Sequence, residues 1–150
     1  MVSHRFSINV FTDAGNRILL LKRGDDTDIG PGQWGFCGGH IEPDESPQQC
    51  AQREIVEEIG PDVRYEAVRD IGPVADTLYG GRFKIWLFHW RWLGGDIRLN
   101  EEHTAWAWVS PASYGNYSVV DGVDEDLAWL EIWPVSRLNQ DKLPTHLLTR

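Results

Sequence analysis

The sequence predicts an α/β fold on the basis of three observations. A strand-turn-strand pattern opens the chain, a capped amphipathic helix follows it, and further strand patterns come after that helix. A length of 150 residues is typical of one domain that buries a core of its own. We therefore expect residues 1–150 to form a single α/β domain.

The first two strands are predicted from apolar patterns on either side of a turn. Residues 5–11 alternate between polar and apolar side chains, residues 17–23 carry an aliphatic run, and Asp13-Ala14-Gly15-Asn16 suits the turn between them. Lys22 and Arg23 end the second strand, where a cation is well placed to bind phosphate. A charged strand end that meets solvent would explain these two residues equally well.

The helix is predicted from the signals at its two ends. Ser46 suits the N-cap, Pro47 suits the first helical position, and Gln49 stands where a capping box needs a side chain that reaches back. The Gly-Pro pair at 60–61 then ends the helix. We expect a helix over the residues between these signals.

Three carboxylates gather on one face of this helix. Glu54, Glu57 and Glu58 fall within an arc of about 100°, at about 100° per residue. Clustered like charges oppose folding, so a hard divalent cation such as Mg²⁺ or Mn²⁺ would stabilise them. Arg53 lies one turn before Glu57 and can hold its carboxylate through an i,i+4 pair. For such carboxylates alone, a solvated helix face is the alternative interpretation.

The acidic face belongs to a longer pattern of 22 residues. It consists of Gly39, five residues, Glu45, seven residues, Arg53-Glu54, an aliphatic residue, any residue, Glu57-Glu58, any residue and Gly60. With each residue type near about 5–9% of average composition, a chance match is on the order of one in ten million per starting position. The pattern therefore disfavours a merely solvated face. Gly38 and Gly39 would allow backbone groups to approach a metal or a phosphate closely.

This pattern closely resembles that of the Nudix hydrolase family, of which MutT-like enzymes are members. Looser agreement extends to residues 19–23, to Gly32-Gln33-Trp34 and to Glu102 six residues ahead of Trp108. The resemblance implies an α/β/α sandwich around a mixed β-sheet, and Mg²⁺- or Mn²⁺-dependent cleavage of a nucleoside diphosphate linked to another group. Two positions depart from the family pattern. Cys37 stands where the family usually has proline, and Pro61 where it usually has an aliphatic residue. Both departures bear on substrate subfamily and loop shape.

The resemblance also implies roles for individual residues. Arg53 would orient Glu57, and Glu45 would sit in the outer shell of a metal or hold the preceding loop. Either Glu54 or Glu102 would be the general base, because the family varies on this point. The implied metal ligands are the carbonyl of Gly38 and the carboxylates of Glu54, Glu57, Glu58 and Glu102. The catalytic set is then Arg53, Glu54, Glu57 and Glu102. A solvated charge in the polar loop 100–103 would explain Glu102 equally well.

After the first helix, the sequence predicts three strands and a second helix. We expect them at residues 63–71, 82–92, 105–109 and 124–133. The strand at 82–92 is expected to pair with residues 77–79 across a two-glycine turn. Its apolar side chains on both faces are typical of a strand buried on both sides. The loop 114–121 is long enough to cover a substrate, and the tail from residue 134 is weakly patterned.

Composition limits the partners and the location of the protein. A net charge of −9 argues against general nucleic-acid binding, so positive charge for phosphates must come from metal ions. Cys37 and Cys50 form no Cys-x-x-Cys motif or Cys/His cluster, so we expect reduced thiols. The first residues lack the order of a signal peptide, and no apolar run has membrane-spanning length. We therefore expect a cytoplasmic protein without a membrane partner, and the sequence leaves a homodimer open.

The substrate is expected to be a small nucleotide. The Ser-Gln-Pro-Trp-Pro-type signature of the NADH-cleaving branch is absent, as is the proline associated with ADP-ribose enzymes. Tyr79 stands near the spacing seen in dinucleoside polyphosphate hydrolases, so it joins Lys22 and Arg23 as a candidate for substrate binding. The first candidate substrate is a nucleoside triphosphate or similar nucleotide, and nucleotide sugars and dinucleoside polyphosphates are the other candidates. The alternatives are a nucleotide-sensing module without turnover, which should have lost part of the acidic set, and an isomerase on the same fold.

Overall fold

The computed structural model describes residues 4–27, 30–77 and 82–148. Tyr79 therefore lies outside the described residues. The strands are β1 (Arg5–Thr12), β2 (Ile18–Arg23), β3 (Trp34–Gly35), β4 (Cys37–His40), β5 (Arg64–Val74), β6 (Lys84–Gly94) and β7 (His103–Val109). The helices are α1 (Pro47–Ile59), α2 (Val123–Leu130) and α3 (Thr145–Leu148), with 3₁₀ turns η2 (Tyr114–Asn116), η3 (Val135–Arg137) and η4 (Gln140–Lys142). No helix in this described part of the chain is both long and apolar enough to cross a membrane.

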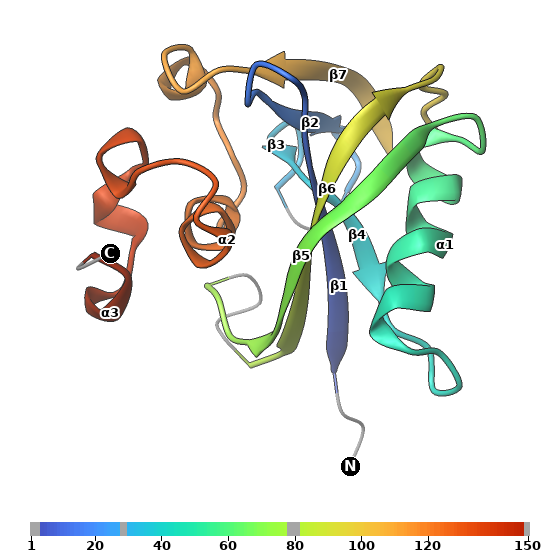
Figure 1. Ribbon diagram of the computed structural model, residues 1–150, viewed down its shortest axis with the longest axis horizontal. Coiled ribbons are helices and arrows are strands. Elements are labelled where there is room, and N and C mark those ends of the chain that lie inside the picture. The colour runs from blue at the N-terminus through green and yellow to red at the C-terminus, as the bar shows by residue number, and fades with distance from the viewer. Residues whose placement is uncertain (1–3, 28–29, 78–81, 149–150) are drawn as a thin grey trace.

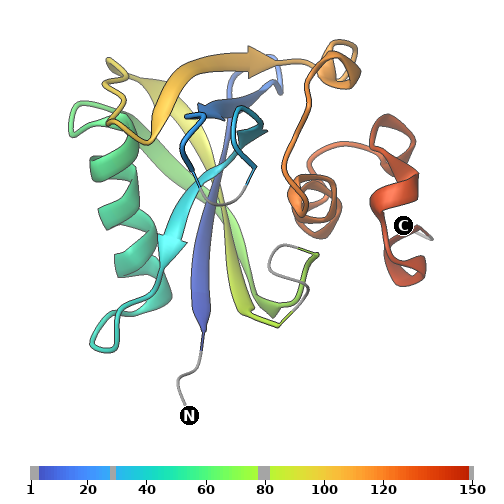
Figure 2. The same cartoon turned by 180° about the vertical axis from the view of Figure 1, so that it is seen from behind.

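The strands form one mixed sheet. Its order is β3-β2-β1-β6-β5, with β4 paired to β1 and β7 paired to β2. The pair β1 and β6 is parallel, whereas the remaining pairs are antiparallel. Figure 1 shows α1 on one face of the sheet and α2 with the C-terminal turns on the other, and Figure 2 shows the same arrangement from behind. The predicted α/β/α sandwich around a mixed β-sheet is confirmed.

Each face of the sheet packs against its own apolar core. Along β2, Leu20 belongs to the core on the α2 side, whereas Leu19 and Leu21 belong to the core beneath α1. This division follows from the alternation of side chains along a strand. Helix α1 contributes Ala51, Ile55 and Ile59 to its core, and α2 contributes Leu127, Ala128 and Leu130 to the other. Both cores therefore rest on the same sheet, one on each face.

Helix α1 forms where its end signals predict it. The Ser46 hydroxyl accepts the N–H of Gln49 at 3.1 Å, and the Gln49 side chain accepts the N–H of Ser46 at 2.9 Å. This reciprocal capping box satisfies two backbone donors that the helix cannot pair by itself. Gly60 ends the helix at a φ of 100°, which glycine adopts without steric cost. The rigid frame for the acidic face is thus set by local sequence.

The pairing partner predicted for β6 is wrong. Strand β6 pairs antiparallel with β5, through contacts such as Ile71 opposite Leu87, whereas Thr77 forms a bend. The strand expected at 63–71 extends to Val74 and supplies this partner. A glycine pair indicates a turn but not the length of the loop around it, so the sequence favoured the nearest segment. The expected burial of β6 on both faces is confirmed over its first half, because Leu87 and Phe88 are both buried.

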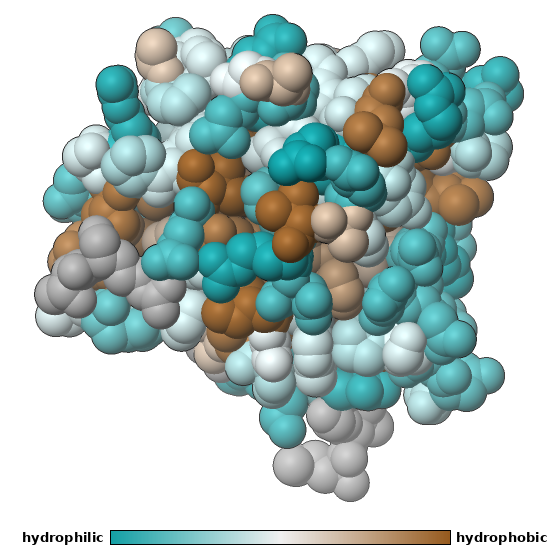
Figure 3. Space-filling model, viewed as in Figure 1, coloured by the Kyte–Doolittle hydropathy of each residue, from teal (hydrophilic) through white to brown (hydrophobic). Residues whose placement is uncertain are grey.

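Strand β5 forms one edge of the sheet and exposes most of its residues. Figure 3, viewed from the same side as Figure 1, shows apolar side chains interrupted by hydrophilic ones on this face. Arg69 pairs with Glu131 at 3.0 Å, and Arg91 of β6 pairs with Glu66 of β5 at 2.7 Å. Charged side chains on an edge strand oppose its pairing with another chain.

The C-terminal region departs from the sequence prediction in two ways. Helix α2 ends at Leu130, because Glu131 adopts a left-handed φ of 56°, so the helix is shorter than the predicted 124–133. The segment after residue 134, expected to be weakly patterned, folds into short turns that bury Leu138, Leu143 and Leu147. Each of its helical turns spans only three or four residues, which is too short for a recognisable helical period.

The first turn of α2 buries three acidic residues, Asp124, Glu125 and Asp126, close to Asp76. Burial raises the pKa of Asp126 well above its usual value, and the charge of Asp76 raises it further. A carboxyl group with a raised pKa in the folded state contributes stability that is fully present below its unfolded pKa. This contribution is lost as the pH rises through the folded pKa, so Asp126 opposes folding at neutral pH.

We expect Asp126→Asn to raise the melting temperature at pH 7. Asparagine resembles the protonated acid and removes the cost of a buried charge, so a gain of about 1 kcal/mol, or about 3 °C, is expected. Thermal melting from pH 4 to pH 8 should show a gain that grows with pH. Asp44→Asn, at an exposed position, is the control and should change little. A lower melting temperature for Asp126→Asn at pH 7 would contradict the prediction.

Candidate active site

A cleft of about 350 Å³ opens where β4 and α1 meet the end of β2. Its apolar wall consists of Phe6, Ile8 and Phe36. The polar side brings together residues that the sequence singled out from four separate segments. These are Arg23, Gly38, Arg53, Glu54 and Glu102. The cleft therefore joins the end of β2, the glycines before the helix, the acidic helix face and the loop that precedes β7.

Glu58 is the buried carboxylate of the helix face, with a side chain only 3% exposed. Its Oε2 atom accepts the backbone N–H of Gly38 at 3.1 Å. Burial raises the pKa of Glu58 well above its usual value, and the carboxylates of Glu54 and Glu102 raise it further. Like charges gathered at a buried position require a proton or a cation to neutralise them.

Glu54 lies against the backbone of β4. A Cβ atom at position 39 would come within 2.5 Å of its Oε1 atom, so only glycine allows this approach. Burial raises the pKa of Glu54, although the neighbouring Arg53 opposes this shift. The glycine predicted to permit a close approach does so for a carboxylate of the helix.

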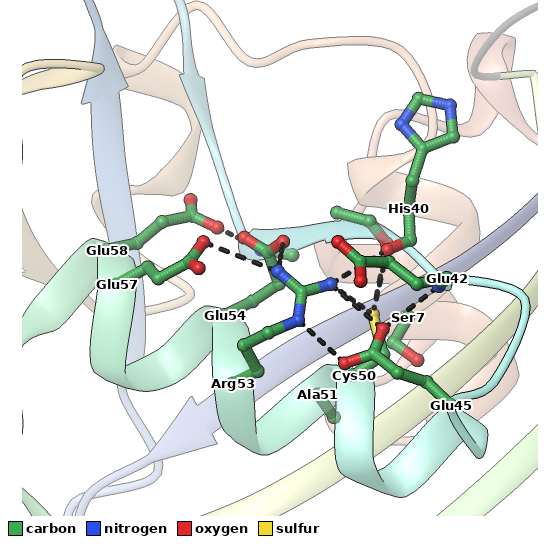
Figure 4. A network of polar contacts seen from close by, with 12 residues as sticks. Ser7, His40, Glu42, Glu45, Cys50, Ala51, Arg53, Glu54, Glu57 and Glu58 are labelled. Atoms are coloured by element: carbon green, nitrogen blue, oxygen red, sulfur yellow. Dashed lines mark hydrogen bonds and ion pairs between the residues drawn. The ribbon is translucent and has the colours of Figure 1, made fainter.

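Arg53 is the hub of the charged network in Figure 4. Its guanidinium donates to both carboxylate oxygens of Glu45, at 2.6 and 3.0 Å, and to Glu54 at 2.8 Å. The predicted i,i+4 contact with Glu57 is present, at a longer 3.4 Å. Arg53 also donates to the carbonyl of His40. Its principal partner is thus Glu45, in the loop before the helix, and the contact holds the pKa of Glu45 down at about 2.

We expect Arg53→Gln to lower the free energy of unfolding by about 1–2 kcal/mol, because it leaves Glu45 and Glu54 without their cation. The Arg53–Glu45 pair is partly exposed, so solvent screens part of its contribution to stability. A lowered folded pKa means that the Glu45 contribution is present above pH 4.5 and is lost as the pH falls through about 2. Urea unfolding at pH 7 and at pH 2 measures both effects.

A double-mutant cycle with Glu45→Gln isolates the pair, and a coupling of about 1 kcal/mol is expected. Arg17 supplies the matched control, because its contact with Asp13 is also an Arg–carboxylate pair but its side chain is 50% exposed. Arg17→Gln should cost less than about 0.5 kcal/mol. Equal losses in Arg17→Gln and Arg53→Gln would show that the network adds nothing beyond a surface pair.

The remaining predicted residues are less closely gathered. Glu57 is 54% exposed and contacts Arg53, and Lys22 is half-buried at the end of β2 but does not line the cleft. Arg23 lines the cleft, and its buried Nε atom has no hydrogen-bond partner among the described residues. A guanidinium group that lines a cleft is suited to an anionic ligand.

His103 is a residue that the sequence analysis did not single out. It begins β7 beside Glu102, and ligand atoms of His103, Glu102 and Glu58 all lie within 4.8 Å of one another. Burial and the charge of Arg23 lower the pKa of His103 to about 4, so the ring is neutral and offers a nitrogen lone pair. The only signal in the sequence was its position next to Glu102. These donors fit a divalent cation, because they combine two carboxylates with a neutral imidazole.

Comparisons with known proteins agree with this geometry. The NUDIX domain family model matches residues 3–130. The nucleoside triphosphatase NudI of Escherichia coli O81 is 33% identical over 110 residues, which span 67% of this chain and 78% of that protein. The MutT protein of Methanosarcina mazei Go1 superposes with a TM-score of 0.65 at 22% identity, over 87% of this chain and 92% of that one. A NUDIX hydrolase from Nitrosomonas europaea superposes with a TM-score of 0.64 at 17% identity, over 97% and 99%.

The two structural matches share the fold, and the NudI relative and the family model define the class of protein. That class is the pyrophosphohydrolases, which cleave diphosphate bonds of nucleotides. The chain belongs to the Nudix family.

Proposed function

We propose that the protein hydrolyses a nucleoside triphosphate or a closely related nucleotide, with Mg²⁺ or Mn²⁺ as cofactor. The observation that carries this proposal is the cleft in which Arg23 and the carboxylates of Glu54 and Glu102 line one space beside an apolar wall. Such a cleft suits a ligand with an anionic end and an apolar end. The similarity to the nucleoside triphosphatase NudI favours a triphosphate over nucleotide sugars and dinucleoside polyphosphates.

The proposed metal ligands are those that the sequence predicted. Because the N–H of Gly38 donates to Glu58 and not to β1, the carbonyl of Gly38 also points away from β1. This carbonyl can join the carboxylates in holding a cation. The proposed set is Gly38, Glu54, Glu57, Glu58 and Glu102. A bound divalent cation lowers the pKa of water and neutralises phosphate oxygens in the transition state.

Residues of the chain itself would position the other groups. Arg53 fixes the carboxylate of Glu54 and, more loosely, that of Glu57, so their orientation does not depend on solvent. Arg23, which lines the cleft, would bind a phosphate through its guanidinium group. Phe6 and Phe36 would exclude water from one side of the substrate. Lys22 and Tyr79 remain proposed contacts for the substrate.

The test is a panel of nucleoside triphosphates, nucleotide sugars, dinucleoside polyphosphates and capped RNA, with identification of the products. Phosphate and pyrophosphate release are measured in chelator, in Mg²⁺ and in Mn²⁺ at matched ionic strength. We expect metal-dependent release, fastest from a nucleoside triphosphate. Nucleotide binding without turnover of any substrate would favour the sensing module, and a rearranged nucleotide without release would favour the isomerase.

Further proposals concern the whole protein. We infer a cytoplasmic location, supported by two free and buried thiols, Cys37 and Cys50. General nucleic-acid binding is not expected at a net charge of −9, and a homodimer stays a prediction. Analytical ultracentrifugation of the full chain would test the homodimer.

A further inference from the structure

His103 is the one nitrogen donor in a group that otherwise consists of carboxylates. We propose that His103 is a direct ligand of the divalent cation, together with Glu58 and Glu102. This ligand makes the centre prefer transition ions such as Mn²⁺ and Co²⁺ to Mg²⁺. The inference rests on the metal centre of the proposed function and specifies its chemistry.

The distance between Glu58 and His103 is the first observation that supports His103 as a ligand. Their side chains are 3% and 5% exposed, and the Nε2 atom of His103 lies 3.6 Å from the Oε1 atom of Glu58. An N–H···O hydrogen bond would bring these atoms to about 2.7–3.2 Å. Two ligand atoms that are each about 2.1 Å from one cation lie about 3.0–3.4 Å apart. The observed distance is thus too long for a hydrogen bond and close to that of two ligands of one ion.

The second observation is that the imidazole of His103 lacks hydrogen bonds. The Nδ1 atom of His103 is buried and has no hydrogen-bond partner among the described residues. Buried polar atoms are nearly always satisfied, because an unsatisfied one loses its hydration without compensation. The Nε2 atom of the same ring faces Glu58 beyond hydrogen-bonding distance, so a cation held there would supply a partner for this nitrogen.

An ion pair is the competing explanation for this contact. A charged imidazolium would close on the Glu58 carboxylate to about 2.7–2.9 Å, since charge-assisted hydrogen bonds are short. The third member, Glu102, lies within 4.8 Å of both groups and contributes another oxygen. The arrangement resembles a site of mixed nitrogen and oxygen donors more than a pair.

The nitrogen donor determines which ion the site prefers. Mg²⁺ binds oxygen and water and loses water reluctantly, whereas imidazole suits later divalent ions. Affinity for a site with nitrogen and oxygen donors rises from Mn²⁺ to Co²⁺. A centre that contains His103 should therefore bind Co²⁺ and Mn²⁺ more tightly than Mg²⁺, and this preference should depend on the imidazole.

Pulsed EPR of the full chain loaded with Mn²⁺ tests the ligand directly. We expect the wild-type spectrum to show coupling of Mn²⁺ to a directly bound nitrogen-14, and His103→Gln to abolish it. His40→Gln is the matched control, because His40 lines the same cleft but lies outside this group. In equilibrium dialysis, His103→Gln should weaken Co²⁺ binding about tenfold to a hundredfold and Mg²⁺ binding much less.

The outcomes separate this inference from the proposed function. Bound Mn²⁺ without nitrogen coupling in the wild type, or coupling that persists in His103→Gln, overturns the role of His103. If the same samples still hydrolyse nucleotides, the proposed function stands without this ligand. Nitrogen coupling without turnover supports the ligand and overturns the hydrolase. The wild-type spectrum needs no variant, and His103→Asn provides a second test if His103→Gln folds poorly.

Discussion

Glu58→Gln is expected to lower the rate of nucleotide hydrolysis by about a thousandfold. The Glu58 side chain is buried beside Glu54, Glu102 and His103, where no positively charged group of the described residues lies within hydrogen-bonding distance. Glutamine keeps the size of the side chain, and its amide oxygen can still accept the N–H of Gly38. The substitution therefore removes the negative charge that would bind the metal, with little change in packing.

The measurement pairs turnover with Mn²⁺ affinity and the melting temperature. Glu101→Gln is the control, because Glu101 is an exposed carboxylate beside Glu102 that does not line the cleft. Glu57→Gln should also lose activity, by on the order of a hundredfold, and it tests whether an exposed carboxylate joins the centre. Unchanged turnover in both Glu57→Gln and Glu58→Gln would overturn the assignment of the metal ligands to this helix.

The parts of the fold that depend on local signals were predictable. The capping box of Ser46 and Gln49 and the stop at Gly60 define α1 within the sequence that forms it. The partner of β6 was not predictable in this way. Strand β5 exposes most of its residues, so its sequence carries no strong alternation, and Tyr65 and Trp92 become neighbours only through the register of the sheet.

The candidate site shows the same contrast between contacts set by local sequence and contacts set by the fold. Glu54, Glu57 and Glu58 share one helix face, so spacing alone predicted their proximity. The main partner of Arg53 was missed, because Glu45 lies eight positions away and meets Arg53 only after the loop before α1 folds back. His103 is farther still from Glu58 in sequence, and the pairing of β7 with β2 brings the two side chains together. No periodicity within one element reports such a contact.

Two carboxylates remain candidates for the general base, and the geometry favours Glu54 over Glu102. Glu54 lines the cleft and is held at 2.8 Å by Arg53 and against Gly39, so its direction is fixed. Glu102 lies in the group with Glu58 and His103, where its carboxylate is better placed to bind a cation than to accept a proton from water. A general base is most effective when its pKa approaches the working pH, and burial raises the pKa of Glu54.

Glu54→Gln is therefore expected to lower the rate constant at saturating substrate by a few hundredfold, within the usual range of about 10²–10⁴ for a lost base. It should also remove the acidic limb of the pH–rate profile, because the rate falls at low pH as Glu54 takes up a proton. Glu102→Gln should instead weaken Mn²⁺ binding and keep that limb. Profiles for both variants at saturating substrate and metal make the comparison. If Glu102→Gln loses the acidic limb and Glu54→Gln retains it, the base lies in the loop before β7 and Glu54 is a metal ligand alone.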